Sequence, residues 1–179
     1  MRFPIEARLK DGTPIQLVLA DQKDVEPLRQ LYRIIVAEGT SYPHDRVPDD
    51  EDFLDYWVRG KSTVAAYLSD CTRSHEMLGA FYLKPNWPGR ARQVANAGFI
   101  VASGWRRKGL GRLLGASMLQ YAKELGYRSV IFNLVFSENL AARHLWKKLG
   151  FAELAVIPGA VRKNDASYQD AVIIWKSLL

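Results

Sequence analysis

The stretch Val101-Ala-Ser-Gly-Trp-Arg-Arg-Lys-Gly-Leu-Gly-Arg112 connects an apolar segment to an amphipathic one, and it decides the fold. A helix that begins in such a loop presents unpaired backbone N–H groups and a partial positive charge. Gly109 and Gly111 allow a positive φ and a close approach of an anion to the backbone. The surrounding cations are Arg106, Arg107, Lys108 and Arg112. The stretch is therefore predicted to bind a pyrophosphate.

This motif matches neither of the two common glycine-rich fingerprints, Gly-x-x-x-x-Gly-Lys-Ser/Thr and Gly-x-Gly-x-x-Gly. Taken alone, it also fits an ordinary helix start with basic decoration. The charge around it is local, because residues 101–150 hold 9 basic and 2 acidic residues, whereas residues 1–60 hold 8 basic and 12 acidic ones. Such a segment indicates a phosphate-bearing ligand, a nucleic acid, or simply a solvated basic face.

Length and composition restrict the classes of protein. The chain has 179 residues, and we expect a single domain over residues 1–179. With 48% hydrophobic and 25% charged residues, it is unlike disordered, collagen-like or coiled-coil chains. No apolar run reaches the ~20 residues that cross a bilayer, and the N-terminus shows no apolar signal region. Because Cys71 is the only cysteine, no intrachain disulfide can form, and we expect a reduced, cytoplasmic setting.

Hydrophobic periodicity and turn residues predict an α/β fold. Strands are expected at residues 5–10, 13–19, 63–68, 77–84, 96–101, 129–135, 151–157 and 171–176. Helices are expected from Asp21 or Asp24 to residue 38, from residue 49 or 50 to residue 58, and over residues 109–125 and 139–149. The alternation of strands and helices in the second half indicates a buried sheet with helices packed on it.

A second motif follows one strand after the first helix. It reads Asn139-x-x-Ala142-x-x-Leu145-Trp146-x-x-x-Gly150-Phe151. Together with Val101-x-x-x-Trp105-Arg106-x-x-Gly109-Leu110-Gly111-x-x-Leu114, it resembles the acetyl-CoA-binding motifs of the GCN5-related N-acetyltransferase (GNAT) superfamily. The resemblance covers roughly residues 77–176. It implies a mixed, mostly antiparallel central sheet with splayed middle strands, flanked by helices.

A narrower resemblance involves strings that are unusual for the superfamily. They are similar to those of fungal acetyltransferases that act on azetidine-2-carboxylate and proline-like imino acids. The strings are Phe53-Leu-Asp-Tyr-Trp57, Gly79-Ala-Phe-Tyr-Leu-Lys-Pro-Asn86, Asn96-Ala-Gly-Phe99, Ile131-Phe-Asn-Leu-Val-Phe136 and Gly39-Thr-Ser-Tyr-Pro43.

The superfamily resemblance implies acetyl-CoA as cosubstrate, bound where two strands splay apart, with direct attack of the amine in a ternary complex. Backbone amides near Phe99, Ile100 and Val101 would hold the pantetheine arm and polarise the thioester carbonyl. The implied pyrophosphate loop comprises Arg106, Arg107, Lys108, Gly109, Leu110, Gly111 and Arg112. Asn139 would cap its helix and contact the coenzyme.

Trp146 departs from the pattern of the superfamily. Many members carry there a tyrosine that is often assigned to protonate the leaving thiolate. An indole N–H donates a hydrogen bond but is not a practical acid, and a thiol with a pKa of ~8.5 leaves well as a thiolate. Trp146 is therefore expected to pack against the pantetheine arm, or to belong only to the core.

Polar residues in apolar strands supply the catalytic candidates. Asn96 and Asn133 each need a partner in such a strand. They either satisfy a bulge or a backbone group, or they orient the amine or a water in the cleft, with Asn133 also supporting the oxyanion. Tyr42 and Tyr82 are candidates for lining the acceptor pocket, with a core position as the alternative.

The general base is not evident from the sequence. His44, Asp45 and Glu38 lie in or beside the loop that should border the acceptor pocket, and a base acting through water is an equal alternative. His75 and His144 show no metal-ligand spacing, so no metal site is expected.

Three functions compete at this point. The first is acetylation of a small amino or imino acid, and the second is acetylation of a protein amine, either an N-terminus or a lysine. The third is a non-catalytic nucleic-acid-binding module. A lid formed by residues 39–50 favours the small substrate, and no recognition strand or basic helix face supports nucleic acid. We expect no membrane partner. The sequence leaves the oligomeric state open, and a homodimer in which terminal strands pair across a two-fold axis is one alternative.

Overall fold

The computed structural model describes residues 1–69 and 76–179, so Cys71 and His75 lie outside the described residues. The strands are β1 (Ile5–Arg8), β2 (Pro14–Leu19), β3 (Ser62–Leu68), β4 (Gly79–Pro85), β5 (Val94–Val101), β6 (Ser129–Phe136), β7 (Ala152–Arg162) and β8 (Tyr168–Ser177). The helices are α1 (Val25–Glu38), α2 (Asp50–Trp57), α3 (Leu110–Glu124) and α4 (Leu140–Lys148). Among the described helices, none combines the length and the apolar character needed to cross a membrane.

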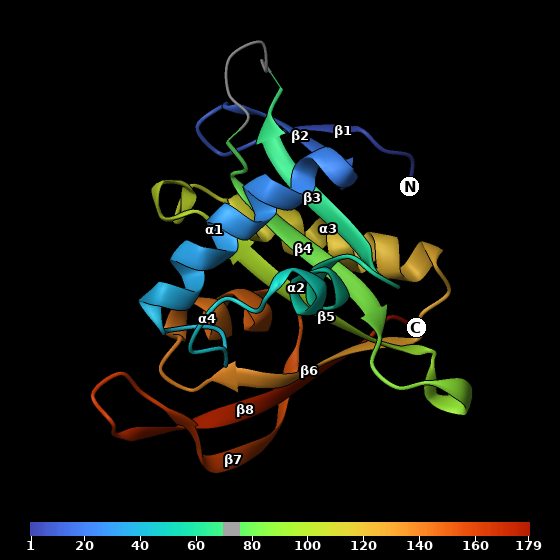
Figure 1. Ribbon diagram of the computed structural model, residues 1–179. Coiled ribbons are helices and arrows are strands. Elements are labelled where there is room, and N and C mark those ends of the chain that lie inside the picture. The colour runs from blue at the N-terminus through green and yellow to red at the C-terminus, as the bar shows by residue number, and fades with distance from the viewer. Residues whose placement is uncertain (70–75) are drawn as a thin grey trace.

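The strands form one mixed sheet in the order β1-β2-β3-β4-β5-β6-β8-β7. Figure 1 shows α1 and α2 on one face of this sheet and α3 on the other. Every described pairing is antiparallel except that of β5 with β6. The predicted fold class, α/β with a mostly antiparallel sheet flanked by helices, is therefore confirmed.

Local signals in the sequence explain where the helices begin and end. The Asp49 side chain accepts a hydrogen bond from the amide of Asp52 at the start of α2. Asn139 caps α4 by accepting from the amide of Ala142 at 3.1 Å. Gly39 ends α1 in the left-handed conformation, with φ 65°. These positions agree with the caps expected from the sequence.

The hairpin of β7 and β8 is longer than the sequence predicted. Strands were expected at residues 151–157 and 171–176, but pairing continues to Arg162 opposite Tyr168. The extension begins with Pro158 and Gly159, which are turn signals in a sequence, and the register shifts between Ile157 and Val161. Pairing resumes beyond this irregularity, where Val161 is buried against Phe136 and Ala171.

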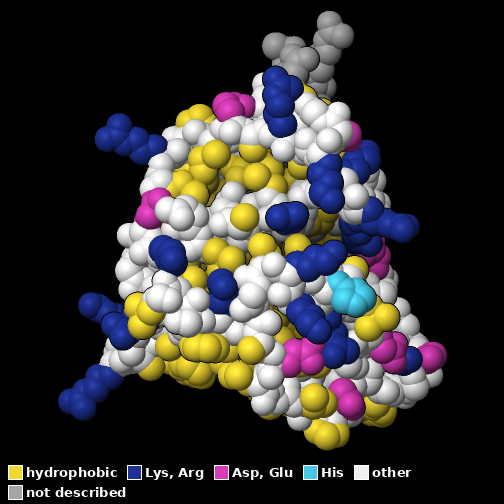
Figure 2. Space-filling model, turned by 180° about the vertical axis from the view of Figure 1, so that it is seen from behind, with side chains coloured by type: hydrophobic (Ala, Val, Ile, Leu, Met, Phe, Trp, Pro, Cys, Tyr) yellow, Lys and Arg dark blue, Asp and Glu magenta, His cyan; other side chains and the backbone are white. Residues whose placement is uncertain are grey.

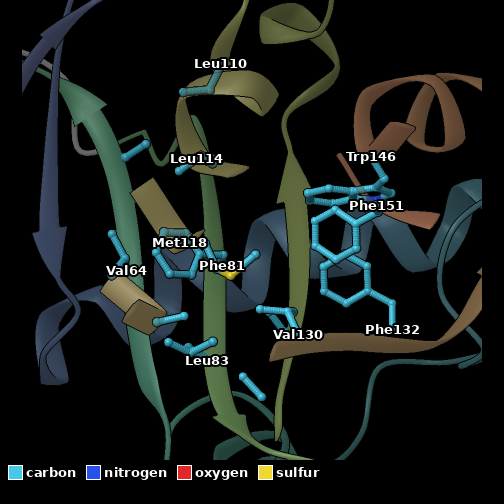
Figure 3. Packing of buried hydrophobic residues seen from close by; sticks show 14 of the residues in the cluster. Val64, Phe81, Leu83, Leu110, Leu114, Met118, Val130, Phe132, Trp146 and Phe151 are labelled. Atoms are coloured by element: carbon cyan, nitrogen blue, oxygen red, sulfur yellow. The ribbon is translucent and has the colours of Figure 1, made fainter. Parts of the chain in front are cut away.

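Two hydrophobic cores lie on opposite faces of the sheet. Along β4, Phe81 and Leu83 belong to the core under α3, whereas Ala80 and Tyr82 belong to the core under α1 and α2. This alternation follows from the two-residue period of a strand. Leu110, Leu114 and Met118 of α3 are fully buried in the first core, as Figure 3 shows.

The sheet splays between β5 and β6. These strands pair in parallel at only two positions, Val94 with Ser129 and Ala95 with Val130. Beyond them β6 continues along β8, with a register shift between Phe132 and Val135. From residue 96 onward, the edge of β5 that faces β6 therefore has no strand partner. This divergence confirms the expected splayed middle strands and positions the candidate site.

Substitution of Gly79 by alanine is expected to destabilise the sheet. The added Cβ would lie 2.8 Å from the backbone oxygen of Ile100 and 3.1 Å from Leu114 Cδ1, and the backbone contact cannot be relieved by a side-chain rotation. Overpacking of this kind costs ~1–3 kcal/mol, which lowers Tm by ~2–4 °C per kcal/mol at this chain length. Thermal unfolding followed by circular dichroism measures the shift. Gly111→Ala is the control, because its Cβ would meet only Leu145 Cδ2 at 3.4 Å.

Candidate active site

A cavity of about 350 Å³ opens where β5 and β6 diverge. Its wall consists of residues from both strands, the end of β4, the loop after α1, and the beginning of α4. The lining includes Tyr42, Tyr56, Tyr82, Lys84, Asn86, Asn96, Gly98, Phe99, Phe132, Asn133, Asn139 and Trp146. The cavity thus brings together Tyr42, Tyr82, Asn96, Asn133, Phe99, Asn139 and Trp146, all selected from the sequence.

One side of the cavity is an aromatic wall. The ring of Trp146 lies 4.7 Å from the ring of Phe99 and 4.7 Å from that of Phe132, measured between centroids. Phe151 stacks on Phe132 at 4.9 Å, and Figure 3 shows these rings together. Trp146 is only 6% exposed, yet it also lines the cavity. The two alternatives considered for Trp146 are therefore combined in one side chain, which belongs to the core and borders the site.

The loop before α3 has the backbone geometry of an anion site at one of its two glycines. Gly109 is the N-cap residue of α3 with φ 100°, and no side chain caps this helix. The first amides of α3 are therefore available to a ligand. The expected positive φ at Gly111 is wrong, because Gly111 lies within the first turn of α3. The second left-handed residue of the loop is Arg107, with φ 64°.

The four basic residues of the loop differ in their surroundings. Arg106 forms an ion pair with Glu38 at 2.6 Å and donates from Nε to the backbone oxygen of Val101 at 3.1 Å. Its charge is therefore compensated, and it connects the loop to α1. Lys108 lies over the ring of Trp105, and Arg107 and Arg112 are exposed. Lys and Arg side chains outnumber acidic ones on the face of the molecule shown in Figure 2.

Two predicted cofactor residues can present only their backbones. Ile100 is 2% exposed and belongs to the core under α1, and Leu110, the first residue of α3, is fully buried in the other core. Their side chains hold the strand and the helix in place. Any contact with a ligand at these positions would therefore use main-chain atoms.

Asn96 and Asn133 both reach the cavity, and each also has a structural partner. The Asn96 amide nitrogen donates to the backbone oxygen of Ile131 at 3.1 Å, bridging the point where β5 and β6 separate. Asn133 lies in the irregular part of β6, and its amide nitrogen donates to Asn86 Oδ1 at 2.7 Å. The alternatives considered for these asparagines are therefore not exclusive in this structure.

Lys84 and Asn86 are cavity residues that sequence reasoning missed. Asn86 Nδ2 is buried and has no hydrogen-bond partner in the described part of the chain, although Asn86 Oδ1 accepts from Asn133. Lys84 is half-buried and lies opposite Asn96 in the ladder of β4 and β5. Among the described residues, no carboxylate lines this cavity. The lining of the cavity therefore includes an ammonium group and an amide nitrogen without a partner among the described residues.

The opposite wall consists of tyrosines packed against a glycine. A Cβ at Gly98 would lie 2.4 Å from Tyr82 Cε1 and 2.8 Å from the Tyr42 hydroxyl, so both rings approach the bare backbone of β5. Burial raises the pKa of Tyr82 and Tyr42 well above the ordinary value, and neighbouring tyrosines add to the shift. Both hydroxyls are therefore protonated across the physiological range.

The three base candidates fall in different places. Glu38 is ion-paired with Arg106, and Asp45 lines an outer hollow of about 790 Å³ rather than the cavity. His44 also lines that hollow, and its Nδ1 lies 2.6 Å from the hydroxyl of Tyr32. Burial lowers the pKa of His44, against a smaller opposing effect of Asp45. His44 is therefore largely neutral near pH 7, as a base must be.

Trp146→Phe is expected to retain most of the turnover. The indole cannot act as an acid, so its loss should cost far less than the ~100-fold that removal of a general acid typically costs. The smaller ring leaves part of the aromatic wall unfilled, so the melting temperature should fall. Steady-state kcat and acetyl-CoA affinity measured on the same preparation test this expectation. A collapse of kcat with unchanged affinity would contradict it.

Within the described residues, no group of three or more His, Cys, Asp or Glu side chains gathers in a way that would hold a metal ion.

Comparison with known proteins identifies relatives of this arrangement. Residues 28–151 match the model of the acetyltransferase (GNAT) family. A 98-residue segment is 44% identical to N-acetyltransferase aca1 of Schizosaccharomyces pombe, covering 54% of this chain and 47% of that protein. The match therefore spans about half the length of this curated relative.

Solved structures share the whole architecture. A GCN5-related N-acetyltransferase from Kribbella flavida superimposes with a TM-score of 0.83 at 30% identity, over 91% of this chain and 97% of that one. The protein yncA from Salmonella typhimurium, solved with its cofactor acetyl-CoA, gives a TM-score of 0.79 at 19% identity, over 92% of this chain and 94% of that one. At that identity, the Salmonella structure supports the fold alone.

Proposed function

The chain belongs to the acetyltransferase (GNAT) family, and from this premise we propose that it transfers the acetyl group of acetyl-CoA to the amine of a small amino or imino acid. Membership makes it an N-acetyltransferase, so a non-catalytic nucleic-acid-binding module is no longer a candidate. The observation that carries the choice of acceptor is the polar lining of the cavity. This lining includes Lys84 and the unpaired Asn86 amide, and no described carboxylate.

Acetyl-CoA fits the site on two observations. The N-terminus of α3 is uncapped, and the edge of β5 after Ala95 is free of a strand partner. Acetyl-CoA supplies the acyl group as a thioester, which an amine can attack directly. The residues proposed to hold it are Phe99, Ile100 and Val101 through their backbone, Arg107, Lys108, Gly109, Leu110, Gly111 and Arg112 at the pyrophosphate, and Asn139 and Trp146 along the arm. Arg106 would order the loop through Glu38 and Val101.

The acceptor would be held by complementary charge. A carboxylate placed between Lys84 and Asn86 receives an ionic contact and a charge-assisted hydrogen bond. Tyr42 and Tyr82 would pack against the rest of the molecule. Asn96 and Asn133 would orient the amine or a water, and Asn133 would also support the oxyanion. The cavity size is that of a small-ligand site, and residues 41–43 close it from one side.

A protein amine is the alternative acceptor. A peptide acceptor needs a groove that is open along its length. A lysine side chain brings no carboxylate, so it would leave Lys84 and Asn86 without a ligand group. We therefore favour an amino or imino acid, which brings a carboxylate together with its amine. The narrower resemblance to fungal imino-acid acetyltransferases supports the same choice.

A thiol-release screen tests the proposed acceptor class. Amino acids, L-azetidine-2-carboxylate and L-proline are compared with lysine peptides and N-terminal peptides, all with acetyl-CoA as donor. We expect the wild type to acetylate an acceptor with a free carboxylate faster than the matched carboxamide. Lys84→Met should abolish this preference without changing the turnover of the carboxamide. Faster turnover of a lysine peptide than of every free acid would refute the proposal.

We also propose that the protein forms a homodimer through β7, which is an edge strand. Ten of its eleven residues are exposed, including Leu154 at 58% and Val156 at 55%. A long, apolar, uncovered edge favours pairing with another chain, and a second copy presents the same edge. Light scattering should give twice the monomer mass of 20.3 kDa, and Val156→Lys should give the monomer. A wild-type monomer at high concentration would refute this assignment.

The reduced, cytoplasmic setting also remains a proposal, supported by the single cysteine of the sequence.

A further inference from the structure

A row of aromatic side chains leads from the cavity to the outer hollow. Tyr82 lines the cavity, Tyr56 lines both the cavity and the hollow, and His44 lines the hollow. Tyr32 of α1 is fully buried between them. These four residues come from β4, α2, α1 and the loop after α1. They therefore meet only in the folded protein.

The contacts along this row are close and ordered. The Tyr32 hydroxyl lies 2.6 Å from His44 Nδ1. The ring of Tyr56 lies 5.8 Å from that of Tyr82, 6.0 Å from that of Tyr32 and 4.7 Å from that of His44. Hence Tyr56 touches every other member of the row.

The hydroxyls of Tyr82, Tyr56 and Tyr32 lie in one buried group. Burial is the main reason that the pKa of Tyr82 is raised, and hydrogen bonding with Tyr56 adds to it. Burial also raises the pKa of Tyr32, and hydrogen bonding with Tyr56 opposes that rise. A relay toward His44 requires that Tyr82 donates to Tyr56, Tyr56 to Tyr32 and Tyr32 to His44 Nδ1, which leaves the proton of the neutral imidazole on Nε2.

We propose that Tyr82, Tyr56 and Tyr32 form a proton relay that connects the acceptor amine to His44. This relay rests on the proposed function, because it needs an amine in the cavity. It makes His44 the terminal base of the reaction, acting through three hydroxyls. It also assigns roles to Tyr32 and Tyr56, which sequence reasoning did not select as site residues.

The proton balance is simple. When the amine nitrogen bonds to the acetyl carbon, it becomes cationic, and the C–S bond breaks to release CoA as the thiolate. The nitrogen gives one proton to Tyr82 while Tyr82 gives its own to Tyr56, Tyr56 to Tyr32, and Tyr32 to His44 Nδ1. The imidazolium then releases the Nε2 proton to solvent through the outer hollow. Each hydroxyl ends with one proton, so no tyrosinate accumulates.

A first experiment needs no acceptor. Nitrogen-15 NMR of the imidazoles, with His44 assigned from the spectrum of His44→Gln, reports which nitrogen carries the proton. We expect an unprotonated Nδ1 in the neutral wild type, and a mixture of tautomers in Tyr32→Phe, where the donor is lost. A wild-type imidazole protonated on Nδ1 would overturn the relay, even if every acceptor had failed in the thiol-release screen.

A second experiment measures turnover with L-azetidine-2-carboxylate, or with whichever amine the screen accepts. Tyr56→Phe and His44→Gln should each lower kcat by ~100-fold without changing acetyl-CoA affinity. The double variant should be no slower than either single variant, because both remove the same path. Tyr127→Phe is the control, since Tyr127 packs against the core under α3. Additive losses, or a wild-type kcat in Tyr56→Phe, would overturn the relay.

The pH profile separates this role from a structural one. Protonated His44 cannot accept a proton. Wild-type kcat at saturating acceptor should therefore decrease when the pH drops below the pKa of His44, which burial lowers. Asp45 on the same loop, Tyr32 from α1 and Tyr56 from α2 face this ring. The other charged groups of the hollow are Arg46, Asp49, Asp52 and Asp55. In His44→Gln this acidic limb should vanish, and its persistence would refute the assignment of His44.

Discussion

Gly98→Ala should reduce kcat/KM by at least ~100-fold, the loss expected when reacting groups are displaced by about 1 Å. The new Cβ would lie 2.4 Å from Tyr82 Cε1, 2.8 Å from Tyr82 Cζ and 2.8 Å from the Tyr42 hydroxyl. Real Cβ atoms do not approach other atoms so closely, so one ring or the strand must move. Either movement changes the wall against which the acceptor is proposed to bind.

The clash at Gly98 is difficult to relieve because both rings are held on their other sides. Tyr42 packs edge-on against Tyr32 at 5.1 Å, and Tyr82 packs edge-on against Trp57 at 5.2 Å. The substitution should therefore also destabilise the fold by ~1–3 kcal/mol. Gly104→Ala is the control for an added methyl group, because a Cβ at Gly104 meets nothing within 4 Å. Full activity of Gly98→Ala would show that the tyrosine wall does not shape the acceptor site.

The sequence predicts the parts of the site whose signals are local. The start of α3, the cap at Asn139 and the apolar strands around Asn96 and Asn133 each follow from a few neighbouring residues. Their convergence on one cavity could also be expected, because the family resemblance implied a splay between two middle strands. In the structure, β5 and β6 do separate after Ala95.

The remaining features depend on contacts between distant segments. Asn86 lies in a turn whose Pro and Gly residues explain its conformation. Nothing local indicates that Asn133, 47 residues later, will donate a hydrogen bond to the side-chain oxygen of Asn86. Gly98 is an isolated glycine in a strand, and its importance appears only when Tyr82 is placed across from it. The link from Tyr32 to His44 is likewise a product of tertiary packing.

Arg106 illustrates why counting charges in the sequence overestimates the number of cations that are free to contact a phosphate. From the sequence it is one of four equivalent cations, but the fold brings Glu38 to 2.6 Å from it. An ion pair of this kind makes an arginine part of the scaffold. The proposed anion site would therefore depend more on backbone amides and on the other three cations than the composition of the loop suggests.

Gly109→Asp should raise the KM for acetyl-CoA by ~10- to 100-fold, equivalent to ~1.4–2.8 kcal/mol. Gly109 occupies the N-cap position of α3, and no side chain caps this helix. A carboxylate there would accept hydrogen bonds from the amides that are proposed to hold the pyrophosphate. It would also repel the phosphate charges directly. Space is not limiting, because the nearest atom to an added Cβ is Lys10 Cγ at 3.5 Å.

Gly109→Asn separates charge from conformation at this position. Asparagine and aspartate have nearly the same shape and tolerate the left-handed region similarly, so both carry the strain that φ 100° imposes. Only aspartate adds a negative charge, and salt screens that contribution. The ratio of the two KM values should therefore exceed ~5 at low ionic strength and shrink as salt is added. Equal KM values for the two variants at low salt would mean that the coenzyme phosphates bind away from the start of α3, and the assignment of this loop would fail.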